Sequence, residues 1–495
     1  MDYDIIIIGS GLGGLECAHI LSRQGYRVLV LERQQQPGGC MQSYRRGDFR
    51  FDTGLHYVGA LDEGQSLHDA FRDLGLLKLP WHRLDPEGFD LVNIGGTTFP
   101  FAEGFGHFAD TLAQYFPKER DALRQYVHTL QTADYTGCIG INAYQFLHQL
   151  FHDELLINVL SGTSLKQELR PSTLPLFSFA HLNSGFIESS WRLAGDGNLI
   201  VHSLTEDLKQ QGGELICHAE VTRLVEQDGR IVAASCSNGE TYTANVFICD
   251  IHPVAMLRLT YDISKIRNTY RRRIHALQNS TGMFTASLLL KPDAIPYFNH
   301  NLYIYSKPNV WHLHEEAEAQ RVGGVMVSCR VPQGQESYVR QIDLLTPMPW
   351  SLCQPFADST TPGRRCMDYT AMKQRFAKQC IQLAETAIPN LAACISECYT
   401  STPLTFRDYN NTPEGTAYGI RKDYANPLLT VLSPQTPIPN LLLTGQNIAL
   451  HGLQGVTMTA FQTCKLVQQI HKPKTIWKTN RFKANTHLSP VQAEA

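Results

Sequence analysis

The sequence predicts an α/β protein built on a doubly wound parallel sheet. Two observations lead to this fold class. One is a strand, glycine loop, helix, strand and terminal acid within residues 5–32, and the other is a second strand–glycine–helix corner near residue 445. The chain has 495 residues, of which 43% are hydrophobic and 18% charged, and this is enough for two or three domains with packed cores.

The first unit begins with the run Ile5–Ile8, which is apolar on both faces as a central parallel strand is. A helix follows, and a second strand over residues 27–31 ends at Glu32, which is followed by Arg33. The loop between the first strand and the helix contains Gly9, Gly11, Gly13 and Gly14. The acid lies 18 residues after the last of these glycines, the spacing of a Rossmann-like dinucleotide-binding unit.

Each part of this unit has a predicted physical role. Gly9 permits the tight turn out of the strand, Gly11 lets the backbone approach a pyrophosphate, and Gly14 allows close packing of the helix on the strand. The N-terminus of the helix offers free N–H groups to phosphates. Glu32 can accept hydrogen bonds from an adenosine ribose, and its charge would repel a 2′-phosphate, which argues against NADP. The fingerprint does not separate FAD from NAD.

Two further segments contain glycines that would let the backbone approach an extended ligand. Gly38 and Gly39 lead into a predicted hairpin with its turn at residues 47–48. The stretch Phe51–Gly59, which reads FDTGLHYVG, contains Gly54. Ordinary turns explain these glycines equally well on physical grounds.

Near the end of the chain, a predicted strand over residues 441–443 runs into Gly445 and Gln446. A helix is expected to begin near Gly455, with Val456 as its first apolar residue. Its dipole could point at an anion, which in a flavoprotein would be the N1–C2=O edge of the reduced ring. An ordinary corner of a doubly wound sheet accounts for the same pattern, so both interpretations stay open.

The middle of the chain differs from its ends. Strands predicted at 214–218, 221–226, 230–236 and 245–249 suit a small sheet attached to the dinucleotide-binding domain. Residues 81–190 and 261–400 are richer in aromatic residues and helical stretches and are expected to form a second region.

Composition excludes several classes of function. The net charge of −3 gives no basic excess for nucleic acid. The 13 cysteines contain no CxxC pair, so reduced thiols are expected and no metal site. No signal peptide or long uncharged apolar stretch is evident, so we expect a cytoplasmic protein that at most contacts a membrane surface. The basic segment 472–495 is expected to be a flexible tail that could touch anionic lipid.

Together these motifs resemble the phytoene desaturase superfamily of FAD enzymes. Within it, FDTGLHYVG and the later LLLTGQN (441–447) look most like retinol saturases and the related carotenoid isomerases. Further likenesses are TPEGTAYGI (412–420) and IDLLTPMPW (342–350), so the resemblance extends over nearly the whole chain. The family's Gly-Gly-Arg signature has Cys40 in place of the arginine, which weakens any inference about a charge near the flavin there.

The resemblance implies an FAD site formed by residues scattered along the chain. By position, it places the pyrophosphate at Gly9, Gly11 and Gly14, the ribose at Glu32, the adenine against the backbone of Val221, the flavin ring beside Gly54, and the phosphate–ribityl side near Gly445 and Gln446. The predicted cofactor-binding set also includes Gly13, Arg33, Gly38, Gly39, Gly455 and Val456.

The implied fold is a discontinuous FAD-binding domain (residues 1–80, 191–260 and 401–471) with an inserted α+β substrate domain (81–190 and 261–400). The inserted domain would form an apolar tunnel that can sit against a membrane. Seven aromatic residues would suit its wall, although each is more often ordinary core: Trp81, Phe99, Phe101, Phe105, Tyr303, Tyr305 and Trp350.

The implied activity is oxidation or reduction of a carbon–carbon double bond in a long apolar polyene or isoprenoid, such as a retinol- or carotenoid-like molecule. For saturation, reduced flavin would give a hydride to one carbon and an acid would protonate the other. Candidates for the proton transfer are His56, Tyr57 and His451. Because no second dinucleotide fingerprint is found, the electron partner stays open between transient NAD(P)H, another reductant and oxygen.

Three alternatives stay open. A flavin-dependent carotenoid cis–trans isomerase would use the same site without net consumption of reductant. An amine oxidase would share the fold and release peroxide. A non-catalytic lipid escort of the GDP-dissociation-inhibitor type would keep a related fold without flavin, and the complete fingerprint with Glu32 argues against it.

Overall fold

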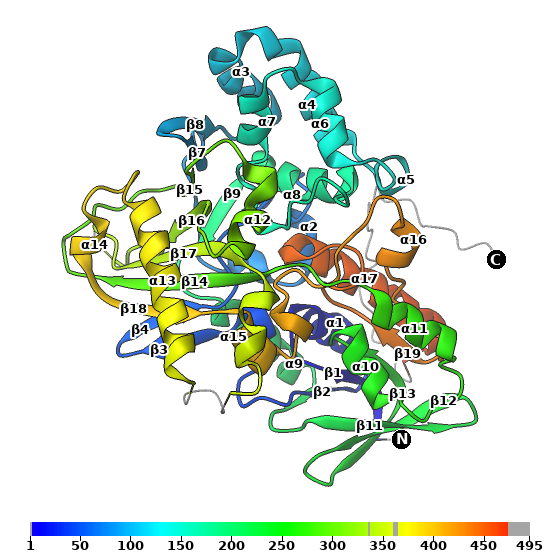
Figure 1. Cartoon of the computed structure of the whole chain (residues 1–495). Coiled ribbons are helices and arrows are strands. Elements are labelled where there is room, and N and C mark those ends of the chain that lie inside the picture. The colour runs from blue at the N-terminus through cyan, green and yellow to red at the C-terminus, as the bar shows by residue number, and fades with distance from the viewer. Residues whose placement is uncertain (1, 335–336, 360–364, 474–495) are drawn as a thin grey trace.

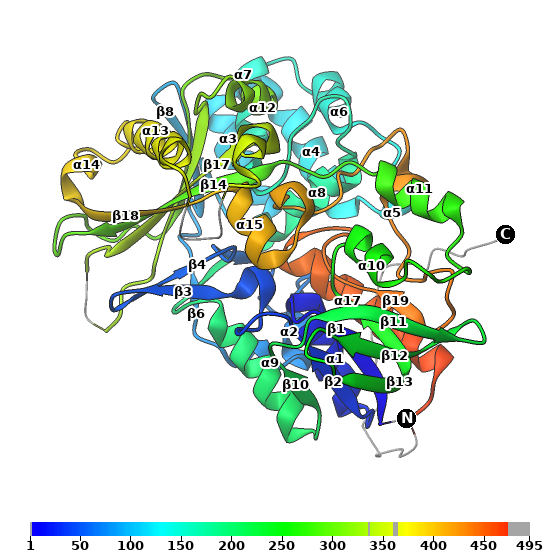
Figure 2. The same cartoon turned by 60° about the horizontal axis from the view of Figure 1, so that its bottom comes forward.

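The computed structural model describes residues 2–334, 337–359 and 365–473. A seven-stranded sheet contains the predicted strand–helix–strand unit, in the order β10-β2-β1-β13-β12-β11, with β19 also paired to β13 (Figures 1 and 2). Its strands are β1 (Tyr3–Ile8), β2 (Val28–Leu31), β10 (Glu214–Ile216), β11 (Val221–Gln227), β12 (Arg230–Cys236), β13 (Thr241–Cys249) and β19 (Leu441–Leu443). The pairs among β10, β2, β1, β13 and β19 are parallel, which confirms the predicted fold class.

The two faces of this sheet are covered by different elements because its central strand is apolar on both. Ile5 and Ile7 pack with three helices, α1 (Leu12–Arg23), α9 (Asn198–Gln210) and α17 (Gly452–Ile470). Ile6 and Ile8 pack on the other side with β11, β12 and the helices α10 (Pro253–Leu259) and α11 (Asn268–Ala276). Because β1, β2, β13 and β19 pair in parallel, their carboxyl ends lie at one edge of the sheet.

A second seven-stranded sheet, in the order β18-β14-β17-β16-β15-β7-β8, forms the other half of the molecule. Its strands are β7 (Asp90–Ile94), β8 (Thr97–Phe101), β14 (Gly282–Leu290), β15 (Asn301–Tyr305), β16 (Gly324–Cys329), β17 (Gln341–Met348) and β18 (Ile395–Ser401). They pair antiparallel except β15 with β7. Helix α13 (Met367–Ala384) packs on one face, and residues of β14 to β17 on the other face pack with helices drawn from residues 105–188 (Figure 1).

Those helices are α3 (Phe105–Tyr115), α4 (Arg120–Thr132), α5 (Tyr135–Cys138), α6 (Ala143–Leu150), α7 (Glu154–Leu160) and α8 (Leu176–Glu188). The remaining helices are α2 (His68–Asp73), α12 (Leu313–Glu318), α14 (Leu391–Cys394), α15 (Pro403–Asn410) and α16 (Pro427–Thr430). Two small sheets complete the fold: the hairpin of β3 (Ser43–Arg46) and β4 (Phe49–Asp52), and a sheet of β5 (Val58–Gly59), β9 (Ser190–Leu193) and β6 (Trp81–Arg83).

Several local predictions agree with the structure and some need correction. The hairpin turns at Gly47, whose φ of 56° is readily adopted by glycine. The strands predicted between residues 214 and 249 do not form a separate small sheet: β10 and β13 join the main sheet, and β11 and β12 continue it. Strand β13 begins at Thr241 instead of Asn245, and helix α17 begins at Gly452, ahead of the predicted Gly455.

The seven aromatic residues proposed for a tunnel wall do not line the cavity described below, so that expectation is wrong. Phe99, Phe101, Tyr303 and Tyr305 are buried in the core between the second sheet and the helices over it. In the part of the chain that the structure describes, no helix is both long and apolar enough to cross a bilayer. Of the predicted tail, residues 474–495 lie outside the described residues.

Candidate functional site

A cavity of about 610 Å³ lies at the carboxyl-end edge of the first sheet and extends to the second sheet. Its walls include the β1–α1 loop, the segment after β13, the segment between β19 and α17, and strands β14, β16 and β17. Fifteen of the residues predicted from the sequence line it: Gly9, Gly11, Gly13, Glu32, Arg33, Gly39, Gly54, His56, Tyr57, Val221, Gly445, Gln446, His451, Gly455 and Val456. Segments that are far apart in the sequence therefore meet in one cavity.

Gly14 and Gly38 are outside the cavity wall and act through packing. A Cβ on Gly14 would lie 2.4 Å from the carbonyl oxygen of Gly9, so only glycine lets the helix sit this close to the strand. Gly38 has a φ of 119°, and a Cβ there would lie 2.7 Å from the Val201 side chain. Both residues shape the loop that borders the cavity.

Glu32 is held in place by its own loop. Its Oε2 atom accepts hydrogen bonds from the backbone N–H of Ser10 at 3.1 Å and from the Ser10 hydroxyl, and Oε1 accepts from Gln34 N–H at 2.7 Å. The neighbouring Arg33 guanidinium donates to the carbonyl oxygens of Asp408 and Tyr409. The carboxylate is thus fixed at the carboxyl end of β2, where a ribose could add further hydrogen bonds.

Asp250, which the sequence reasoning missed, lies at the centre of the fingerprint loop. A Cβ on Gly11 would come within 2.5 Å of its Oδ2 atom, and one on Gly445 within 2.3 Å of Oδ1, so both glycines make room for this side chain. Burial raises the pKa of Asp250 to about 7, and the nearby Glu32 contributes to the shift. The available signal was its position directly after strand β13, because ligands bind at the carboxyl ends of parallel strands.

The cavity wall contains buried polar atoms that have no hydrogen-bond partner within the described protein. They are Asp250 Oδ2, His56 Nδ1, His181 Nε2, Thr412 Oγ1 and Asn447 Oδ1. Because buried polar groups are nearly always hydrogen-bonded, this set indicates a ligand that has polar groups along its length. The residues present therefore fit a flavin dinucleotide, with Asp250 on the side of the fingerprint loop.

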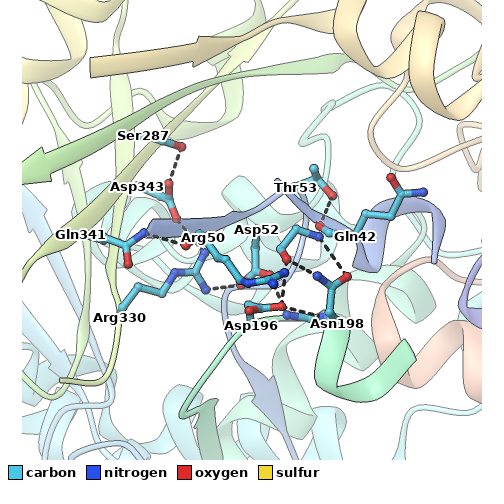
Figure 3. Close-up of polar contacts among 12 residues, drawn as sticks. Gln42, Arg50, Asp52, Thr53, Asp196, Asn198, Ser287, Arg330, Gln341 and Asp343 are labelled. Atoms are coloured by element: carbon cyan, nitrogen blue, oxygen red, sulfur yellow. Dashed lines mark hydrogen bonds and ion pairs between the residues drawn. The ribbon is translucent and has the colours of Figure 1, made fainter. Parts of the chain in front are cut away.

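A buried ion-pair network fixes the FDTGLHYVG stretch against the second sheet (Figure 3). Asp52 accepts a hydrogen bond from Gly197 N–H at 2.7 Å and forms an ion pair with Arg330. Arg330 also contacts Asp343 of β17 at 3.2 Å, and Asp343 accepts a hydrogen bond from Ser287. Burial raises the pKa of Asp52 to about 6, although Arg330 opposes the shift. The network joins the β3–β4 hairpin and the start of α9 to the second sheet, close in sequence to Gly54, and was not predicted from the sequence.

The three predicted proton-transfer residues lie around the same cavity. Burial lowers the pKa of His56 and of His451 to about 4, so both imidazoles are neutral near pH 7. His451 Nε2 donates to the Lys166 carbonyl oxygen at 3.0 Å, which leaves Nδ1 as an acceptor. The Tyr57 hydroxyl lies 2.7 Å from Asp90 Oδ2 and 2.9 Å from the Lys166 ammonium.

Comparisons with known proteins show what this chain is similar to. The family described as "NAD(P)-binding Rossmann-like domain" matches residues 7–74. The chain is 23% identical to human all-trans-retinol 13,14-reductase, covering 92% of this chain and 84% of that protein. It is 23% identical to the neurosporene-forming phytoene desaturase of Rhodobacter capsulatus, covering 84% of each. A prolycopene isomerase of an Oncidium hybrid is 25% identical over half of this chain.

These enzymes are homologues of this chain. The family resemblance predicted from the motifs is thereby confirmed.

Solved structures confirm the fold. Cyclohexylamine oxidase from Brevibacterium oxydans superposes with a TM-score of 0.63 at 14% identity, covering 95% of this chain and 99% of that one. A Rab GDI from Plasmodium falciparum superposes with a TM-score of 0.52 at 12% identity, covering 94% and 98%. Because an amine oxidase and a GDI share this fold, the fold alone does not decide between an enzyme and an escort.

Proposed function

We propose that this protein is an FAD-dependent oxidoreductase that acts on a carbon–carbon double bond of a long apolar polyene or isoprenoid. The observation that carries the proposal is the continuity of one cavity from the dinucleotide fingerprint to the apolar side chains of the second sheet. Gly9, Gly11 and Glu32 line one part, and Met283, Met326 and Leu345 line another. The homology to a retinol reductase and a phytoene desaturase supports the same class of substrate.

In this proposal, the bound flavin supplies hydride transfer to or from the substrate carbon. The chain's own residues bind and orient both partners: the fingerprint loop and Glu32 hold the dinucleotide, and the Asp52–Arg330–Asp343 network fixes the segment that contains Gly54. Methionine, leucine and phenylalanine side chains of the cavity wall exclude water from the apolar substrate.

Proton transfer is assigned to the residues at the cavity wall. His56 and His451 are neutral near pH 7, so they suit proton acceptance better than donation. The Tyr57 hydroxyl, hydrogen-bonded to Asp90 and Lys166, is the candidate donor for saturation. NADH or NADPH is proposed as a transient electron donor, because Glu32 and the single fingerprint are assigned to FAD.

Cis–trans isomerisation of a polyene is the second candidate, and the likeness to prolycopene isomerase favours it over an amine oxidase or a lipid escort. It would use the same cavity. The substrate class also leads us to propose a cytoplasmic protein with peripheral membrane contact, for which the exposed Leu428 and Leu429 on α16 are the candidate surface.

The test is the visible absorption spectrum of the purified protein, before and after anaerobic addition of NADH or NADPH. Flavin bands that bleach support the oxidoreductase with a nicotinamide donor, and consumption of a C20 polyene alcohol then tests saturation. Flavin bands that persist, together with isomerised but not reduced polyene under dithionite, support the isomerase. Protein that binds no FAD even after reconstitution contradicts both.

A further inference from the structure

A lysine with a buried ammonium is among the residues that line the cavity. Lys166, in the short helical turn Ser164–Lys166, lines the cavity, and its Nζ lies 3.6 Å from the centre of the Phe186 ring. An ammonium has three N–H donors, and within the described protein its one hydrogen-bond acceptor is the Tyr57 hydroxyl at 2.9 Å. The other two donors have no hydrogen-bond partner in the described protein.

The positive charge of Lys166 is only partly neutralised by a nearby carboxylate. Asp90 is the carboxylate behind Tyr57, and the tyrosine hydroxyl stands between it and the ammonium. The positive charge of Arg192, which is fully buried, also favours the ionised form of Asp90. The described hydrogen-bond partners of Arg192 are neutral: Tyr297 Oη, Cys329 Sγ, the His300 carbonyl oxygen and Asn301 Oδ1. One carboxylate is thus shared by two buried cations, of which Lys166 borders the cavity.

Several apolar side chains line the same cavity as Lys166. Leu165, Met283, Met326 and Leu345 line the cavity and belong to the same hydrophobic core as Tyr57. Burial lowers the pKa of the Lys166 ammonium to about 8, and Asp90 opposes the shift, so the charged form still dominates at pH 7. A charge that is desolvated in this way gains most from a second partner of opposite sign.

We propose that Lys166 binds the carboxylate end of a long apolar substrate, whose hydrocarbon chain lies along the methionine and leucine side chains of the second sheet. This inference rests on the proposed function and names its substrate class more narrowly. The carboxylate would accept the two available N–H donors and restore the balance of charge around Asp90. A neutral hydrocarbon would leave both donors unpaired, and an ester could accept a hydrogen bond through its carbonyl oxygen but would not neutralise the ammonium, so both should bind more weakly.

The experiment compares two ligands that differ in charge at one end. All-trans-retinoic acid and its methyl ester are titrated into full-length, FAD-loaded protein at pH 7, and dissociation constants are measured from fluorescence quenching. We expect the acid to bind about tenfold to a hundredfold more tightly than the ester, because hydrogen bonds to charged groups discriminate by that much. Equal affinities, or no binding of either ligand, would overturn the inference without any variant.

Variants then test whether Lys166 is the cause. Lys166→Met keeps the length of the side chain and removes its charge, so the acid should lose its advantage while the ester still binds. Lys166→Arg keeps the charge and should retain part of the preference. Lys118→Met, on the exposed surface, is the matched control and should behave as the wild type. A preference that survives in Lys166→Met would overturn the inference.

The absorption spectrum of every sample separates the two proposals. Protein without flavin bands contradicts the proposed function itself. Flavin-loaded protein that is reduced normally but binds acid and ester equally contradicts the carboxylate assignment alone. If Lys166→Met does not fold, the comparison of acid and ester in the wild type and in Lys166→Arg still tests whether Lys166 binds the carboxylate.

Discussion

The carboxyl group of Asp250 makes a definite prediction about pH. Asp250→Asn keeps the size of the side chain and removes its titration. In the folded protein, burial raises the pKa of this carboxyl from 3.8 to about 7. The native state therefore holds a proton that the unfolded state has released between about pH 4 and pH 7, and stability falls as pH rises through that window. The Asp250→Asn variant should not lose stability in this way as the pH rises.

The size of the effect follows from the shift. Each pKa unit corresponds to about 1.4 kcal/mol, so between pH 5 and pH 8 the wild type should lose about 3 kcal/mol relative to Asp250→Asn. With an unfolding entropy of about 2.1 cal/mol/K per residue, that is a relative change in Tm of about 3 °C for the whole chain. Burial raises the pKa of Glu16 to about 8, and the charge of Asp250 adds to that shift, so Asp250→Asn should also lower the pKa of Glu16.

Thermal unfolding of the flavin-free protein, followed by intrinsic fluorescence from pH 5 to pH 8, measures this difference. Asp48→Asn, at an exposed position, is the control and should run parallel to the wild type. FAD affinity should also fall with rising pH in the wild type and much less in Asp250→Asn, since an ionised carboxylate in the fingerprint loop repels phosphate. Parallel Tm curves for the wild type and Asp250→Asn would refute the reasoning.

Three further outcomes are expected. Gly14→Ala should lower Tm and FAD content because its Cβ would lie 2.4 Å from a backbone oxygen, whereas Gly106→Ala, which meets nothing within 4 Å, should change neither. Arg330→Met leaves two buried aspartates without their cation and should reduce the free energy of unfolding by about 3–5 kcal/mol in urea denaturation; a loss under 1 kcal/mol would argue against this network. Leu428→Ser combined with Leu429→Ser should weaken co-sedimentation with anionic lipid vesicles, and unchanged binding would exclude α16 as the membrane contact.

The first 60 residues were predictable because their signals are local. Glycines at fixed spacing after a β-branched run, and an acid 18 residues later, specify a strand–helix–strand unit within one short segment. The hairpin at residues 43–52 was likewise predictable from its turn. The strands near residue 230 were located correctly but assigned to a separate sheet, because pairing between strands that are far apart in the sequence leaves no pattern in a single sequence.

The sequence by itself determined the Rossmann-like unit, the likeness to the polyene-converting enzymes and most of the residues that line the cavity around the glycine fingerprint. Only the tertiary structure decided which residues line the cavity near the second sheet. Lys166 and Tyr57 meet across 109 residues of chain, and Arg330 and Asp52 across 278. Such contacts are set by how two sheets and their helices pack, and packing brings together residues whose spacing along the chain has no regular period.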